Sequence, residues 1–169
     1  MIVGSGDIGS AIDDIPRALI HVSGVSNSRF IDNYHKDETY REMSSIQSYC
    51  KENPSAHFIY LSSLSIYEKI SPYTEHKRMM EKAVIGHSSS CSILRIGNIT
   101  WGKNPHTIIN FFRNNPNARV EDVYRYLITL DELNYWIRKA YEEKIPELNI
   151  TGERVKAQEI MDRVKDGRL

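Results

Sequence analysis

Short apolar runs alternate along this chain with segments that carry the marks of helices, and this alternation limits the fold more than any other feature. The runs lie at residues 1–3, 18–23, 57–61, 92–96 and 148–150. They are short and rich in Ile, Leu and Val, as buried strands are. Strands that alternate with helices predict an α/β domain with a parallel sheet.

Helix signals mark the segments between these runs. Residues 35–53 place Tyr40, Met43, Ile46 and Tyr49 on one face at helical spacing, which predicts an amphipathic helix. Further helices are expected at about residues 71–85, 104–112, 129–144 and 156–164. The second of the five starts with Ser-Pro and the fourth with a capping box, both of which are typical helix starts. Residues 120–128 read as one or two strands.

A glycine-rich loop follows the first apolar run directly. Gly4, Gly6 and Gly9 fit the pattern G-x-G-x-x-G, and a very short helix can follow before Pro16. Glycines in this context let the turn close and let a diphosphate approach the backbone. The loop therefore predicts a dinucleotide site, although a plain strand-to-helix turn would use the same residues. Asp32 lies too far beyond the second strand to be assigned to the ribose.

Tyr73 and Lys77 form a Tyr-x-x-x-Lys pair at the start of an expected helix. Residues four apart share one helical face, so the ammonium can favour the phenolate form of the tyrosine. Spacing alone is weak evidence, because Tyr135 and Lys139 have it too. That second pair lies in mid-helix and is interpreted as an amphipathic surface. Tyr73 is favoured because it follows a strand that ends in Ser63, whose hydroxyl can bind the same substrate oxygen.

The composition excludes several classes of function. The 169 residues include 22 basic and 22 acidic side chains, so no net field attracts nucleic acid or an acidic membrane. No apolar run approaches the length of a membrane span, and no signal-peptide pattern begins the sequence. Two cysteines lack zinc or redox spacing, and six histidines are scattered. We expect a cytoplasmic protein without a metal site.

Six segments, in order, resemble one protein family across nearly the whole chain. Residues 58–67 are similar to a strand that leads into S-S-x-x-V-Y, and residues 71–77 resemble S-P-Y-x-x-S-K. Residues 94–102 are similar to L-R-x-x-N-V-Y-G. The other matches lie at 21–26, 125–132 and 148–152. The chain thus resembles the extended short-chain dehydrogenases, the NAD-dependent epimerase/dehydratase family.

The resemblance implies a site residue by residue. It makes Ser63, Tyr73 and Lys77 a catalytic triad, with NAD or NADP as the cofactor and a nucleotide-sugar or other small molecule as the substrate. The cofactor-binding residues would be Gly4, Gly6, Asp7, Ile8, Gly9, Ser23 and Gly24. The substrate-binding residues would be Ser65, Asn98 and Arg125. Leu64 and Ser65 stand where sugar dehydratases carry Asp-Glu, which argues against dehydration.

The chain also departs from the family pattern. Only residues 4–17 separate the glycine loop from the next matched strand, so at least one βαβ unit is missing. That unit supplies the adenosine half of the cofactor pocket. The expected fold is therefore a reduced Rossmann-like sheet with helices on both faces and a small C-terminal substrate-side subdomain. Within a single domain, 1–104 would form the cofactor-binding core and 105–169 the interleaved substrate-side elements.

Deletion of these strands would make the first strand a sheet edge, and exposed edges are usually covered. We expect loops of the chain or a second subunit, as in a homodimer, to cover it. Three functions stay open: an NAD(P)-dependent oxidoreductase or epimerase, a catalytically degenerate nucleotide- or sugar-binding module, and an enzyme whose adenosine site is rebuilt by dimerisation.

Overall fold

A computed structural model describes residues 1–24, 31–68 and 70–169, and for residues 31–36 it describes the backbone alone. Residues 25 and 26 of the matched segment 21–26, and the Asp32 side chain, lie outside the described residues. No helix in the described ranges is long and apolar enough to cross a membrane.

Five parallel strands form the main sheet in the order β1-β2-β3-β4-β7. Their bounds are Ile2–Val3, Ala18–His21, His57–Ser63, Cys91–Ile96 and Glu147–Ile150. Every residue of β2 is buried, and so are the first six of β3. Strands covered on both faces lack the polar alternation of a half-exposed sheet, which explains why they appear in the sequence as continuous apolar runs.

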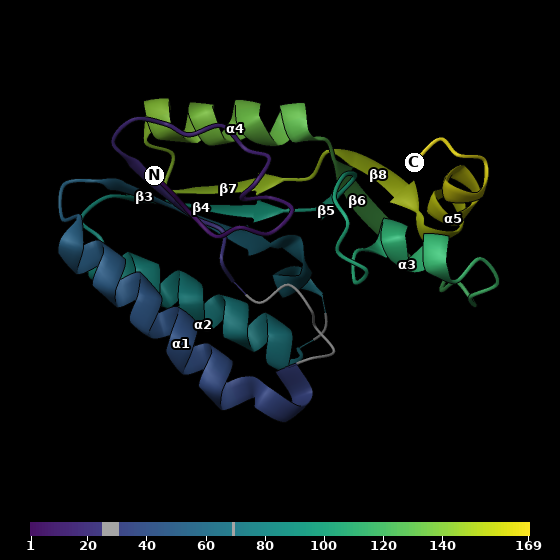
Figure 1. Ribbon diagram of the computed structural model, residues 1–169, viewed down its shortest axis with the longest axis horizontal. Helices are drawn as coiled ribbons and strands as arrows, with labels where there is room; N and C mark the ends of the chain where they lie inside the picture. Colours follow the sequence, from purple (N-terminus) through teal and green to yellow (C-terminus); the bar gives the residue numbers. More distant parts are fainter. Residues whose placement is uncertain (25–30, 69) are drawn as a thin grey trace.

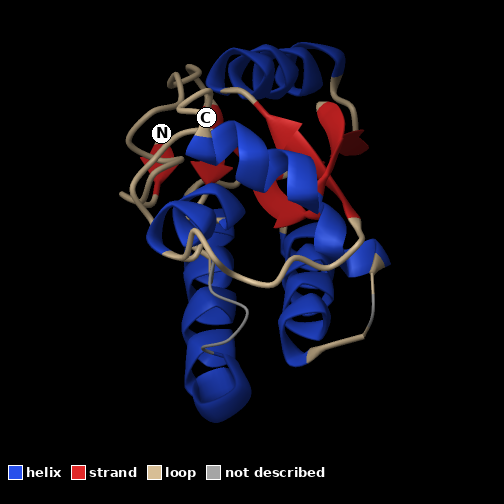
Figure 2. Ribbon diagram, turned by 90° about the vertical axis from the view of Figure 1, so that its right-hand side faces the viewer, coloured by secondary structure: helices blue, strands red, loops and turns tan. Residues whose placement is uncertain are grey.

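Helices cover both faces of this sheet. α4 (Leu130–Glu143) packs on one face, while α1 (Ile31–Glu52) and α2 (Pro72–His87) lie side by side on the other (Figures 1 and 2). Leu133 and Ile137 of α4 belong to one apolar core, and Ile46 of α1 with Met80 of α2 to the other. The expected α/β fold, a Rossmann-like parallel sheet with helices on both faces, is confirmed.

A smaller layer is built from the C-terminal part of the chain. Its three strands, in the order β5-β6-β8, are Asn98–Ile99, Tyr124–Ile128 and Glu153–Lys156. Two helices, α3 (Ile108–Asn114) and α5 (Ala157–Lys165), share a separate apolar core with this sheet. Between β6 and β8 in the sequence, the chain returns to the main sheet, where it forms α4 and β7 (Figure 1). The smaller layer therefore stands beside the carboxyl end of β4.

β1 is an edge strand, as the shortened sequence predicts, since it pairs only with β2 among the described strands. It has two residues, so little edge is open. The N-terminal ammonium donates to the carboxylate of Asp14 at 2.6 Å and to the carbonyl of Ala18 at 2.8 Å. These bonds tie the strand to the crossover that follows it.

Three sequence expectations are wrong in detail. No helix follows the glycine loop: residues 7–11 form turns, because Pro16 and β2 leave too little chain. The predicted face of α1 is rotated, since Tyr40 is 71% exposed while Thr39 and Glu42 are buried. α3 begins at Ile108, with Thr107 as its N-cap, and not at residue 104. The short strands β5 and β8 were not predicted, because β5 has only two residues and β8 has one apolar residue among three charged ones.

Candidate active site

The carboxyl ends of the parallel strands meet at one edge of the sheet, where α/β proteins bind ligands. Two pockets lie there, of about 490 and 450 Å³. We call the first the glycine-loop pocket, because residues 4–8 line it, and the second the Arg125 pocket. Both are lined by Ser63, Tyr73, Ile96, Gly97, Asn98 and His106. The two pockets therefore adjoin at the predicted catalytic residues.

The three glycines of the loop have different roles. Gly4 has a φ of 124°, and a Cβ there would lie 2.8 Å from the backbone nitrogen of Ser23. A Cβ on Gly9 would collide with the Gly4 carbonyl, so Gly9 lets the loop fold back on itself. Gly6 is different, since a Cβ there would meet no atom within 4 Å. Gly4 and Gly6 line the pocket, whereas Gly9 closes the turn behind it.

Asp7 ties this loop to the segment before α3. Its carboxylate accepts a hydrogen bond from the Asn104 backbone N–H at 2.7 Å, and its carbonyl accepts one from the Trp101 indole at 3.1 Å. Gly102 is needed beside it, because a Cβ there would overlap the Asp7 carboxylate. Asp7 therefore shapes the wall of the glycine-loop pocket, with Ile8 beside it.

Ser63 is the last residue of β3 and caps the short 3-10 helix η1 (Leu64–Tyr67). Its hydroxyl accepts a hydrogen bond from the Ser65 backbone N–H at 3.2 Å and lies 2.8 Å from the Ser65 hydroxyl. A cap of this kind fixes the side-chain rotamer. Ser63 is thereby held at the junction of the pockets, while Ser65 faces the Arg125 pocket.

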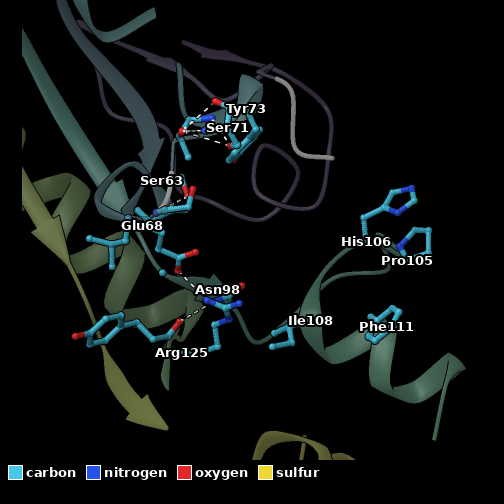
Figure 3. A pocket seen from close by; sticks show the side chains of 16 residues that line it. Ser63, Glu68, Ser71, Tyr73, Asn98, Pro105, His106, Ile108, Phe111 and Arg125 are labelled. Carbon is cyan, nitrogen blue, oxygen red and sulfur yellow. Dashed lines mark hydrogen bonds and ion pairs between the residues drawn. The ribbon is translucent and has the colours of Figure 1, made fainter. Parts of the chain in front are cut away.

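Tyr73 is the second residue of α2. Ser71 is the N-cap and forms a reciprocal capping box with Thr74, and Pro72 occupies the first helical position. These residues start the helix directly after the loop that leaves η1. Tyr73 is half-buried and lines both pockets. Figure 3 shows it among the residues of the Arg125 pocket.

Lys77 lies one turn further along α2 and is buried. Its ammonium donates to the Tyr60 hydroxyl at 3.2 Å and lies 6.0 Å from the centroid of the Tyr73 ring. It is also 3.9 Å from a carboxylate oxygen of Glu42. An ammonium has three N–H groups, and the bond to Tyr60 uses one of them. Lys77 also lines the glycine-loop pocket.

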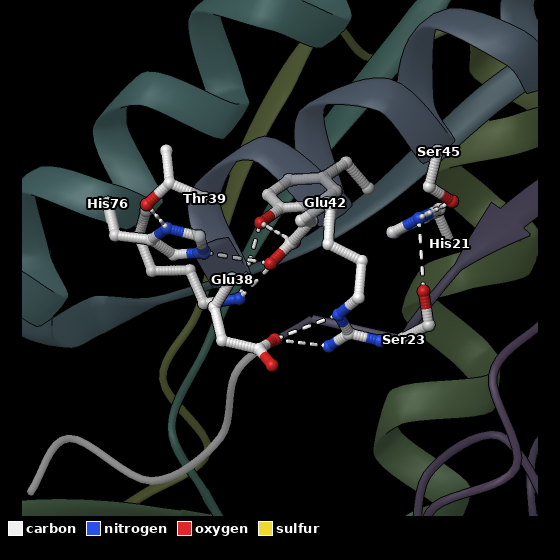
Figure 4. Close-up of polar contacts among 10 residues, drawn as sticks. His21, Ser23, Glu38, Thr39, Glu42, Ser45 and His76 are labelled. Carbon is white, nitrogen blue, oxygen red and sulfur yellow. Dashed lines mark hydrogen bonds and ion pairs between the residues drawn. The ribbon is translucent and has the colours of Figure 1, made fainter. Parts of the chain in front are cut away.

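Glu42 of α1 is the centre of a buried polar cluster (Figure 4). One carboxylate oxygen accepts from Tyr60 at 2.8 Å, and the other lies 2.8 Å from Nε2 of His76. The hydroxyl of Thr39 lies 3.0 Å from the second nitrogen of that ring. Burial alone would raise the pKa of Glu42, but the charge of Lys77, with His76 and Tyr60, outweighs burial and lowers it. Glu42 is thus a buried carboxylate anion.

The cluster also explains Gly24, which lies three residues after the end of β2. A Cβ on Gly24 would lie 2.6 Å from both the Lys77 ammonium and a Glu42 oxygen. Burial, followed by the charge and hydrogen bond of Glu42, raises the pKa of Tyr60 well above its ordinary value. Tyr60 therefore stays a neutral phenol that bridges the two charged groups. Next to Gly24, Ser23 lines the glycine-loop pocket and its hydroxyl lies 3.1 Å from Nε2 of His21.

The Arg125 pocket holds the predicted substrate residues. The side-chain amide of Asn98 donates to the Tyr126 carbonyl at 3.2 Å, which anchors it to β6. The guanidinium of Arg125 donates to a carboxylate oxygen of Glu68 at 2.8 Å, across the pocket from the end of η1 (Figure 3). Both partners are partly exposed, so this ion pair is open to solvent.

Apart from Gly9, every predicted site residue lines one of the two pockets. Sequence reasoning missed four charged or titratable neighbours: Arg41, Glu42, Glu68 and His106. Glu42 could not be predicted, because an acidic residue in an amphipathic helix is normally assigned to the exposed, polar face. Glu68 and His106 lie in loops that have no periodicity. Arg41, which lines the glycine-loop pocket, precedes Glu42 on α1.

No protein-family model matches the sequence, and no curated protein matches it. Solved structures do match the fold. The NAD-dependent NDP-hexosamine 5,6-dehydratase TunA, involved in tunicamycin biosynthesis, has a TM-score of 0.74 at 15% identity over 90% of this chain and 61% of that one. WbmG of Bordetella bronchiseptica, solved with NAD and UDP, has a TM-score of 0.73 at 13% identity over 90% and 56%.

The UDP-glucose 4-epimerase of Thermus thermophilus, in complex with NAD, has a TM-score of 0.73 at 15% identity over 89% of this chain and 61% of that one. The present chain therefore spans about three fifths of the length of such proteins. The chain therefore shares a Rossmann-like fold with these three NAD-dependent or NAD-bound proteins.

Proposed function

We propose that this protein is an NAD(P)-dependent oxidoreductase or epimerase that acts on a hydroxyl or ketone of a nucleotide-sugar. One observation carries the proposal: the two pockets adjoin at Ser63 and Tyr73, with Lys77 in the wall of the first. A cofactor in the glycine-loop pocket and a substrate in the Arg125 pocket would then meet at these side chains. WbmG, which has a similar fold, binds both NAD and UDP, so one protein of this fold holds a dinucleotide and a nucleotide together.

The glycine-loop pocket fits part of a nicotinamide dinucleotide. Space beside Gly6 leaves the backbone open to a phosphate. Two cations also line the pocket: Arg41, which is paired with Glu38, and Lys77, which lies beside Glu42. The hydroxyl of Ser62 is buried behind the same wall and has no hydrogen-bond partner among the described residues. No described strand lies beyond β1 to hold an adenosine.

When bound, the cofactor would supply the hydride acceptor or donor. The residues of the chain would manage the proton. Ser63 would donate a hydrogen bond to the substrate oxygen, and Tyr73 would exchange a proton with that oxygen. Lys77, which lies beside Glu42, would stabilise the phenolate that forms on Tyr73. Arg125 would bind the diphosphate of the substrate, and Asn98 would position its sugar.

Paired tyrosine substitutions test the catalytic role. Tyr73→Phe removes only the hydroxyl, and we expect turnover to fall by about 100-fold or more because an acid-base group contributes that much. The control is Tyr135→Phe, which makes the same change in the exposed pair of α4 and should leave turnover unchanged. Oxidation of NADH and NADPH by nucleotide-sugar ketones is the measurement. Activity retained in Tyr73→Phe would remove Tyr73 from the mechanism.

A binding module without catalysis is the second candidate. The observation that favours it is the bond of Lys77 to Tyr60 beside Glu42, which holds the ammonium within a buried cluster. Such a protein would bind a nucleotide or a sugar in the same pockets. Calorimetry that detects NAD or UDP, together with no turnover on any substrate of the panel, would favour the module over the enzyme.

A further inference from the structure

The ion pair between Glu68 and Arg125 lies inside the pocket in which a substrate diphosphate would bind. Both side chains line the Arg125 pocket, with one guanidinium nitrogen 2.8 Å from a carboxylate oxygen. The Arg125 side chain is 28% exposed and the Glu68 side chain 53%. The pair therefore faces the space that a ligand would fill.

We propose that Glu68 is an internal competitor for the anionic end of the substrate, so that a diphosphate must displace its carboxylate from Arg125. This inference rests on the proposed function, because it assumes that Arg125 binds the diphosphate. A carboxylate and a phosphate oxygen use the same donors of a guanidinium. Glu68 would thus set how strongly charged a ligand must be to occupy the pocket.

The geometry allows this exchange at small cost. The backbone of Glu68 is fixed as the C-cap of η1, where its N–H donates to the Ser65 carbonyl at 2.9 Å. Only the side chain needs to change rotamer, and its exposed carboxylate returns to water. An exposed ion pair contributes at most about 1 kcal/mol, a factor of about five in an equilibrium constant. A diphosphate carries more charge than one carboxylate, so it wins this competition.

Calorimetric titration with UDP tests the proposal through opposite changes of affinity. Glu68→Gln keeps the shape of the side chain but removes the charge that competes for the guanidinium, and UDP should bind more tightly than to the wild type, by up to about fivefold. Arg125→Gln should weaken binding by at least about tenfold. A gain of affinity is diagnostic, because damage to the fold would weaken binding.

Glu147→Gln is the matched control. Glu147 is 54% exposed and pairs with Arg95 at 2.9 Å, but neither residue lines the Arg125 pocket. The Glu147→Gln variant should bind UDP as tightly as the wild type does, although it changes the net charge by the same amount as Glu68→Gln. Unchanged or weaker binding by Glu68→Gln, with Arg125→Gln still impaired, would overturn the competitor role alone. Absence of binding by both the wild type and Glu68→Gln would overturn it together with the proposed function.

Discussion

Two helices of this protein carry a tyrosine followed four residues later by a lysine, and the two pairs have different surroundings. Tyr73 and Lys77 begin α2 beside the carboxyl ends of β3 and β4, and both line the glycine-loop pocket. Tyr135 lies within α4 and is 57% exposed, with the Lys139 ammonium 5.9 Å from its ring centroid. The two pairs have the same spacing in the sequence. Only the pair that lies at the carboxyl ends of the strands lines a pocket, so position relative to the sheet distinguishes the candidate site.

Each lysine also has a carboxylate at the same distance. Lys77 lies 3.9 Å from Glu42, and Lys139 lies 3.9 Å from Glu143. The Glu42 side chain is 1% exposed and that of Glu143 is 58% exposed. Water screens the exposed pair of Lys139 and Glu143, whereas Lys77 and Glu42 are buried together, where charges are screened much less.

The largest difference between the two pairs should appear when each carboxylate is neutralised. Glu42→Gln leaves the Lys77 charge buried without its counter-charge, so we expect the free energy of unfolding to fall by about 3 kcal/mol or more. Glu143→Gln removes one exposed charge and should change it by less than about 0.5 kcal/mol. Urea denaturation of both variants is the measurement. Equal, small effects would mean that the inner pair is not a buried ion pair.

A smaller effect is expected in the pH dependence of stability, to which one buried histidine on each face of the main sheet contributes. His21, stacked on Phe58, and His57, whose ring packs against Tyr141 of α4, are both buried. Burial lowers the pKa of His21 to about 4; burial and then the charge of Lys144 lower that of His57 to about 4. The unfolded chain therefore takes up protons first as pH falls below about 6.5, and stability is lost between there and pH 4.

The expected slope is at most about 1.4 kcal/mol per pH unit for each histidine, measured by urea unfolding at several pH values between about 4.5 and 6. His57→Gln should make the slope shallower. Exposed His87 offers the control, since His87→Gln should leave the slope as it is. A wild-type stability independent of pH in this window would show that the two rings are not buried in neutral form.

The sequence contains enough information to predict the main sheet and the starts of two helices. β2 and β3 are buried on both faces, so burial and apolar sequence coincide there. The capping boxes that begin α2 and α4 form as side-chain and backbone bonds between residues three apart. Such local signals survive folding because they do not depend on distant parts of the chain.

Contacts across the fold were not predictable in the same way. Glu42 meets Lys77 only because α1 and α2 pack side by side on one face of the sheet. Its charge interrupts the buried face of α1, which is why the predicted face included exposed Tyr40. Glu68, the C-cap of η1, and Arg125 of β6 form an ion pair although 57 positions separate them in the sequence. These pairs depend on tertiary packing, which one sequence does not reveal.

Binding of a nicotinamide dinucleotide tests whether the glycine loop forms a cofactor site. Gly6→Val would fill the open space beside the loop, whereas Gly86→Val adds the same group where a Cβ also meets no atom within 4 Å, on α2 away from both pockets. Calorimetry should show micromolar binding of NAD or NADP by the wild type and by Gly86→Val, and binding at least about tenfold weaker by Gly6→Val. No binding by the wild type, or equal binding by Gly6→Val, would contradict a cofactor site at the glycine loop.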